Sequence, residues 1–250
     1  MGSSLTTVFI VSGSVTDPVN VTKLLVLGVV SAMSFSLLLQ SGLFGFVGQS
    51  RALWIFSGIF LTSALASILL SDSPISQGVY GTYGRNNGFL AYLFLVGLFL
   101  STLALSRRES ISRIIVWLIV AGLVNVIYCL WVIAFGDFVG WNNPYGNILG
   151  TLGNPNFIGS FLGIFIAAYL GYGLGKTAPL WFKYSMLIVL PVAAFEIYDS
   201  SAIQGRIVGL SGIVIIGFFM VRSRFNSIVT ALYLGLVSFV GFFAVLGALQ

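Results

Sequence analysis

Arg206 is the residue whose chemistry the sequence points to most directly. It stands in the segment SSAIQGRIVGLSG (200–212), directly before an apolar run (207–221) that is 15 residues long. A helix of that length measures roughly 22 Å, whereas the hydrocarbon core of a bilayer is about 30 Å thick. A helix that spans here must therefore begin before Arg206. A guanidinium placed in or near the membrane costs about 2.5–3.5 kcal/mol and usually faces a partner or a wet cavity. We expect the polar loops of the chain, including the one with Arg85, to converge on Arg206 and to hold an anionic group there.

Three polar residues close to Arg206 are further candidates for this site. Ser201, like Ser200, suits the cap of the helix that carries Arg206, and Gln204 falls in its first turn. Glu196 lies one residue inside the end of the preceding apolar span, where it could pair with an arginine or act as a base. A pair of Arg206 with Asp199 or Glu196 that only closes a helix end is the simpler alternative.

A second candidate segment reads GVYGTYGRNNG (78–88) and contains Arg85, Asn86 and Asn87. Its glycines permit positive φ and close backbone approach, and an arginine offers five donors in a planar fork that suits phosphate. The helix expected after Gly88 would add free N–H groups, which favour an anion. The alternative is a hairpin loop in which Arg85 is an interfacial anchor.

The third segment, GNILGTLGNPN (146–156), precedes another apolar span. Pro155 suits the first turn of that helix and Asn154 its N-cap, which is a sufficient role for Asn154. Capping explains Asn156 less well, and its amide could face a cavity. Asn-Pro-Asn also occurs in water channels, but those need a second matching half-helix motif, which this sequence lacks.

The three candidate segments must be positioned by membrane helices, because the composition of the chain is that of a membrane protein. The chain has 250 residues, of which 58% are hydrophobic and 7% charged, and its mean hydropathy is +1.07. Soluble domains carry about 25% charged residues. We therefore expect an all-α, polytopic transmembrane bundle in one membrane domain, 1–250, without a soluble domain. The predicted spans number about eight: 23–39, 52–70, 88–105, 114–135, 157–174, 180–197, 202–221 and 228–249.

The distribution of basic residues predicts which ends of these spans face the cytoplasm. One set of connections carries eight of the eleven basic residues and the other carries three. The richer set should be cytoplasmic. It comprises Arg51, Arg107, Arg108, Arg113, Lys176, Lys183, Arg222 and Arg224, against Lys23, Arg85 and Arg206. All three candidate segments then fall on the outer face. The net charge of +5 is scattered between apolar spans and does not indicate nucleic-acid binding.

Several other chemistries are not supported by the residues present. The chain has no histidine and one cysteine, Cys129, so we expect no zinc or haem site and no cofactor. It also lacks the glycine-rich phosphate loop of nucleotide-binding proteins and the Gly-x-Ser-x-Gly elbow of hydrolases. Gly159/Gly163 and Gly205/Gly209 have the small-xxx-small spacing of helix contacts in membranes, although glycine is common in such helices anyway.

The three segments in their order support a family comparison. YGTYGRNNGFLAYL (80–93), GTLGNPNFIGSFL (150–162) and SSAIQGRIVGL (200–210) together resemble the O-antigen ligase and O-antigen polymerase family. The lead-in TDPVNVTKLLVL (16–27) resembles the segment after a first helix in bacterial members. The resemblance covers most of the chain, and the three motifs in order are more specific than any one of them.

The resemblance implies a glycosyltransferase on the outer face of the bacterial cytoplasmic (inner) membrane. Such an enzyme moves a glycan from an undecaprenyl diphosphate carrier to an acceptor, which is a glycan, a lipid or a protein. By the same resemblance Arg206 binds the donor diphosphate, and Arg85 and Asn156 match the arginine of the Gly-Arg-Asn-Asn-Gly loop and the last asparagine of the Asn-Pro-Asn turn. No metal or nucleotide sugar is implied.

One departure from the family concerns the proton acceptor. Family members continue into a large external loop with a histidine regarded as the base and a further arginine, whereas this sequence has no histidine and stops at Gln250. It therefore resembles an N-terminal portion of such an enzyme. The alternatives are a secondary transporter or lipid-linked glycan flippase, with broken helices that line a solute path, and a binding or scaffold fragment. We find no inverted repeat of the kind a transporter predicts.

Overall fold

The structure of this protein, a computed structural model, is all-α over the residues it describes. These are residues 1–11, 17, 19–40, 50–82, 84–104, 108–140 and 143–248, with the side chains of 104, 108–110, 240 and 242–248 not described. The α-helices are α1 (Gly2–Leu5), α2 (Asn20–Gln40), α4 (Arg51–Leu70), α5 (Ile75–Tyr80), α6 (Phe89–Ser101), α7 (Arg108–Phe135), α8 (Pro155–Gly173), α9 (Leu180–Asp199), α10 (Ile203–Arg224) and α11 (Ser227–Ala248). Short 3-10 turns follow α6 (η1, Thr102–Ala104) and precede α8 (η2, Gly150–Leu152).

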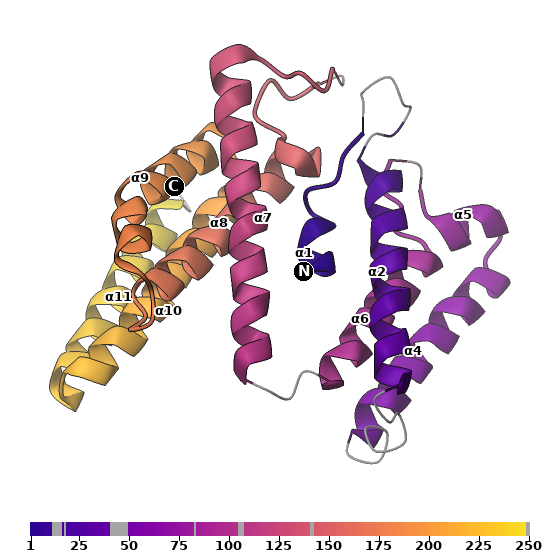
Figure 1. The fold of residues 1–250 in the computed structure, drawn as a ribbon, viewed down its shortest axis with the longest axis horizontal. Coiled ribbons are helices and arrows are strands. Elements are labelled where there is room, and N and C mark those ends of the chain that lie inside the picture. Colours follow the sequence, from indigo (N-terminus) through magenta and orange to yellow (C-terminus); the bar gives the residue numbers. More distant parts are fainter. Residues whose placement is uncertain are drawn as a thin grey trace. The chain divides into compact units, whose positions relative to one another are not determined.

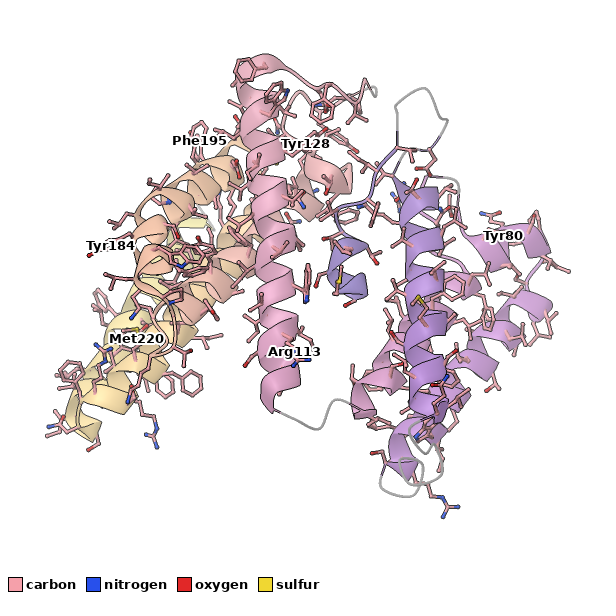
Figure 2. All side chains as sticks on the ribbon, in the orientation of Figure 1. Tyr80, Arg113, Tyr128, Tyr184, Phe195 and Met220 are labelled. Atoms are coloured by element: carbon pink, nitrogen blue, oxygen red, sulfur yellow. The ribbon has the colours of Figure 1, made fainter. Side chains whose placement is uncertain are left out.

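The long helices have the length and composition of membrane spans. Within the described ranges, six helices are long and apolar enough to cross a bilayer: α2, α4, α7, α8, α9 and α10. Large apolar side chains such as Tyr184 and Phe195 of α9 are more than half exposed (Figure 2). A soluble protein would bury such apolar surface, whereas in a membrane protein this surface faces the hydrocarbon core of the bilayer. The prediction of a multi-pass membrane protein is confirmed.

Each of the eight predicted spans contains a helix, with two differences in length and content. α6 has 13 residues, or about 20 Å, and is short for a span. The segment predicted as a loop at 71–87 contains α5, which begins after Pro74. The helix ends before Gly81, whose φ is +91°. Tyr83 and Arg107, which the sequence placed on loops, lie outside the described residues.

The chain divides into two compact units; the colours of Figure 1 follow the chain continuously from its N-terminus to its C-terminus. Unit 1 comprises Met1–Val124 and Phe135–Pro144, and unit 2 comprises Asn125–Ala134 and Tyr145–Gln250. In unit 1, α6 packs against α2, α4 and α5. In unit 2, α8 packs against both α9 and α10, and α11 packs against α10. Arg85 belongs to unit 1, while Arg206 and Asn156 belong to unit 2.

Local polar contacts fix where the site-bearing helices begin. The Asp17 side chain accepts hydrogen bonds from the backbone N–H groups of Val19 (3.2 Å) and Asn20 (2.8 Å), which would otherwise be unsatisfied at the start of α2. At α8, Asn154 is the N-cap, its Oδ1 accepts from the Asn156 N–H at 2.9 Å, and Pro155 occupies the first turn. The sequence-based prediction for this helix start is therefore confirmed.

A seam of glycines joins α8 to α10 in unit 2. A Cβ at Gly205 would lie 2.6 Å from the backbone carbonyl of Gly159, and one at Gly163 would lie 2.8 Å from the backbone of both Gly205 and Gly209. The two small-xxx-small pairs of the sequence thus face each other. Without side chains the two backbones approach closely, which is how helices gain packing energy in lipid.

Candidate functional site

Arg206 lies in the first turns of α10, because that helix begins at Ile203. The prediction that the spanning helix starts before the arginine is confirmed. The Arg206 side chain is exposed, and its guanidinium carbon lies 5.4 Å from the ring centroid of Tyr198 near the end of α9. A cation over an aromatic face at an exposed site gains about 0.5–1 kcal/mol. Tyr198 therefore restrains the guanidinium and leaves its N–H donors available.

Glu196 does not neutralise Arg206. Its side chain is completely buried, and neither carboxylate oxygen has a hydrogen-bond partner among the residues described. The simple alternative of an Arg206–Glu196 pair is thus contradicted. Burying a carboxyl group without a partner is costly, and inside a membrane protein such a group marks a functional position by default. Glu196 is separate from the exposed face that carries Arg206.

The serines before α10 do not cap it in the way the sequence suggested. The N-cap is Ala202, which has no side-chain hydrogen bond to the helix. Ser200 is buried; its hydroxyl donates to the Ile197 carbonyl (2.7 Å) and accepts from the Ala202 N–H (3.3 Å), so it closes the end of α9 instead. Ser201 is exposed with φ +56°. The first N–H groups of α10 consequently lack a side-chain cap and can serve an anion.

The glycine seam brings the beginnings of α8 and α10 to the same end of unit 2. Arg206 follows Gly205 directly, and Asn156 precedes Gly159 by three residues, so each lies within a turn of the closest backbone contact. Asn156 is exposed, whereas Asn154 is partly buried as the cap. Gln204 is exposed on the first turn of α10. Among the predicted residues, the structure thus places Asn156, Gln204 and Arg206 at one end of one helix pair.

Three long-range hydrogen bonds, none of them predicted from the sequence, hold the third segment in place. Asn125, fully buried in α7, accepts from the Thr151 N–H (3.0 Å) and hydroxyl (2.8 Å) in η2. The Asn147 amide donates to the Ser200 carbonyl at 3.3 Å. The signal for Asn125 was available, because a lone amide in an otherwise apolar span usually has a partner. Its partner, 26 residues further along, could not be read from sequence.

Arg85 stands on a tight loop in unit 1 that is closed by glycines. Gly81 and Gly88 touch at its neck, where a Cβ on either residue would collide with the backbone of the other side. The Thr82 carbonyl accepts from the N–H groups of Arg85 (3.0 Å) and Asn86 (3.1 Å). The Arg85 side chain is exposed. Gly81 and Gly88 are therefore explained by close backbone approach, as the sequence predicted.

The two asparagines after Arg85 shape this loop. Asn87 Oδ1 accepts from the Thr82 N–H at 3.2 Å, so part of this amide holds the loop together. Asn86 has φ +45°. The loop is also tied to α2, because the Asn20 amide donates to the Gly84 carbonyl at 2.7 Å. Asn20 was not among the predicted site residues, and it positions the residue directly before Arg85.

Comparisons with known proteins do not assign a family or a function to this chain. Family models, curated protein sequences and solved structures gave no match to the chain. The likeness to O-antigen ligases therefore stays a prediction that depends on the three motifs. The convergence of Arg85 with Arg206 also stays a prediction, since the two arginines belong to different units.

Backbone strain gives a further reason to regard these segments as functional. Within the part of the chain that the structure describes, Asn86 and Ser201 are the non-glycine residues with positive φ. Both belong to the predicted set. Such conformations cost about 1–3 kcal/mol for most residues and concentrate at ligand sites, although asparagine tolerates them well. No group of three potential metal-binding side chains occurs among the described residues. The exposed side chains of these segments therefore provide guanidinium and amide N–H donors.

Proposed function

We propose that this protein binds an undecaprenyl diphosphate-linked glycan from the outer side of the bacterial inner membrane and takes part in transferring the glycan to an acceptor. The observation that carries the proposal is Arg206. It is a permanently charged side chain at an uncapped helix start, it lies over Tyr198, and Glu196 does not pair with it. A diphosphate supplies the negative charge and the acceptor oxygens that such a group lacks.

In the proposed reaction, Arg206 binds the leaving group. An acceptor hydroxyl oxygen attacks the anomeric carbon of the donor sugar, the bond from that carbon to the diphosphate oxygen breaks, and undecaprenyl diphosphate departs with the electron pair. Arg206 and the free N–H groups at the start of α10 would stabilise this growing negative charge. The hydroxyl proton goes to a base, for which the family resemblance implies a histidine, a residue type that these 250 residues lack.

Binding of a lipid diphosphate tests the proposal without requiring turnover. The protein is reconstituted in lipid nanodiscs, and the Kd for farnesyl diphosphate is measured by thermophoresis for Arg206→Ala. Arg224→Ala, at the other end of the same helix, is the matched control. Charge-assisted hydrogen bonds are worth about 1.5–3 kcal/mol, so we expect Arg206→Ala to weaken binding at least about 10-fold. Equal affinity of the wild type and both variants would refute the proposal.

Glu196 supports a second candidate, a proton- or cation-coupled secondary transporter. A buried carboxyl group without a partner in a membrane helix is the usual mark of a coupling site. In this case proteoliposomes would accumulate a solute under an ion gradient, and Glu196→Gln would abolish the uptake. Uptake of lipid-linked glycan without transfer would identify a flippase instead.

A further inference from the structure

A polar hollow of about 260 Å³ lies in unit 1, where the end of α4, the helix α5 and the neck of the Arg85 loop meet. Its polar lining comes from Ser67, Ser71, Ser73, Gln77, Thr82 and Asn87, and the other lining residues are one isoleucine and three glycines. Among the residues that the structure describes, no charged side chain lines it. The loop was a candidate segment from the sequence, whereas the serines, which come from the end of α4 and the turn after it, were not.

Several of these polar groups are available to a ligand. The side chains of Ser67, Ser73 and Gln77 make no hydrogen bond to any residue that the structure describes. Ser71, by contrast, donates to the Ile68 carbonyl at 3.2 Å, and Asn87 Oδ1 is held by Thr82. The hollow therefore offers hydroxyl and amide groups that can both donate and accept, in a site without formal charge.

This lining fits one class of ligand best, a neutral molecule with many hydroxyl groups. A sugar ring presents hydroxyls that donate and accept, whereas a phosphate or an ammonium group would require an opposite charge. The volume is just under the lower end of about 300 Å³ for ordinary ligand pockets, which suits one ring and not a longer glycan. Tyr80, exposed on α5, stands next to Gly81 of the lining (Figure 2).

An apolar groove of similar volume lies nearer the beginning of α4, which lines both sites. It measures about 260 Å³ and is formed by α2, α4 and α6, with Phe35, Leu61 and Phe94 among its lining. Leu61 precedes Ser67 on α4 by six residues, which is about 9 Å along the helix axis. Unit 1 thus has a polar hollow and, on another face of α4, an apolar groove, which suit a sugar head and a hydrocarbon chain respectively.

We propose that the hollow lined by Ser67 and Gln77 binds one sugar ring of a lipid-linked glycan, with its lipid chain in the groove formed by α2, α4 and α6. This inference rests on the proposed function for the identity of the carrier. It adds that unit 1 recognises the sugar, and that recognition uses neutral hydroxyl and amide groups.

Two lipids that differ only in the sugar test this inference. The Kd values of farnesyl diphosphate and of farnesyl diphosphate-linked N-acetylglucosamine are measured in nanodiscs for the wild type, Ser67→Trp and Ser63→Trp. Trp at 67 fills the hollow, while Ser63, one turn earlier on the same face of α4, is exposed and outside the lining. We expect the sugar to improve wild-type affinity at least 5-fold, and this advantage to disappear in Ser67→Trp but remain in Ser63→Trp.

The other outcomes separate this inference from the proposed function. Equal binding of the two lipids to the wild type would overturn the sugar site and leave diphosphate binding intact. A sugar advantage that survives in Ser67→Trp would also overturn it, because the sugar would then bind elsewhere. Loss of the sugar's affinity advantage in both Ser67→Trp and Ser63→Trp would also overturn the sugar site, because the loss would then be caused by tryptophan at either position. Failure of both lipids to bind would refute the proposed function together with the inference.

Discussion

Replacing Gly205 by alanine tests whether the glycine seam positions the arginine. The added Cβ would lie 2.6 Å from the Gly159 carbonyl group, whereas ordinary contact begins at 3.4 Å. The obstacle is backbone and cannot rotate away, so α8 and α10 must separate by about 0.8 Å at this point. Overpacking of this kind costs about 1–3 kcal/mol. We expect a fall in Tm of roughly 2–12 °C for a chain of this size.

The single cysteine supplies the assay for this prediction. Cys129 is fully buried in α7 and belongs to unit 2, so a thiol-reactive fluorogenic maleimide should label it only when that unit opens. Gly235→Ala is the matched control, because a Cβ there would meet no atom within 4 Å. Its Tm should stay the same or rise slightly, since alanine favours helix over glycine.

The same variant should also weaken ligand binding. Arg206 follows Gly205 directly, and a misplacement of about 1 Å at a site can cost up to about 100-fold in rate. Gly205→Ala should therefore lower affinity for farnesyl diphosphate at temperatures well below its Tm. Unchanged Tm and unchanged affinity together would show that the seam does not position the arginine, and would refute the reasoning.

Three further substitutions give predictions of smaller scope. Tyr198→Leu should raise the Kd for farnesyl diphosphate about 2–5-fold by removing the ring under Arg206, and Tyr198→Phe should not; equal values for both would contradict the stacking role. Lys23→Met should make the first ten residues more sensitive to limited proteolysis, because the Lys23 amine donates to the carbonyls of residues 6, 7 and 9; an unchanged cleavage rate would contradict this. Glu196→Gln should leave the Tm unchanged or higher, because a neutral amide is cheaper to bury than a carboxylate, and a fall above about 5 °C would reveal a cationic partner.

The sequence predicts the helices well because membrane spans depend on local composition. The cap at Asn154 and Pro155 was predictable because it depends on residues within one turn. The start of α10 before Arg206 was predictable because the apolar run after the arginine is too short to span a bilayer. α5 was missed because Ser, Pro and Gly dominate the segment around it and give little periodicity. Ser201 was a poor capping prediction, because residue types that suit a cap also suit the turn that ends the preceding helix.

The contacts that assemble the candidate site could not be read from sequence. Asn147 and Ser200 are 53 residues apart, and Asn20 and Gly84 are 64 residues apart. Glycine spacing indicated that helices approach one another but not which ones, and the pairing of α8 with α10 came from the structure. Arg206 had two acidic candidates nearby in sequence, yet its observed neighbour is an aromatic ring.

The burial of Cys129 has a practical consequence for spectroscopy. Because this single thiol is inaccessible in the folded chain, cysteines can be introduced at exposed positions and spin-labelled without removing the native one. Ile75 on α5 and Leu210 on α10 are exposed, lie outside the proposed sites and stand near the two arginines in sequence. Dipolar spectroscopy on a doubly labelled chain would then report the separation of the two loops in a lipid bilayer, with and without a diphosphate lipid.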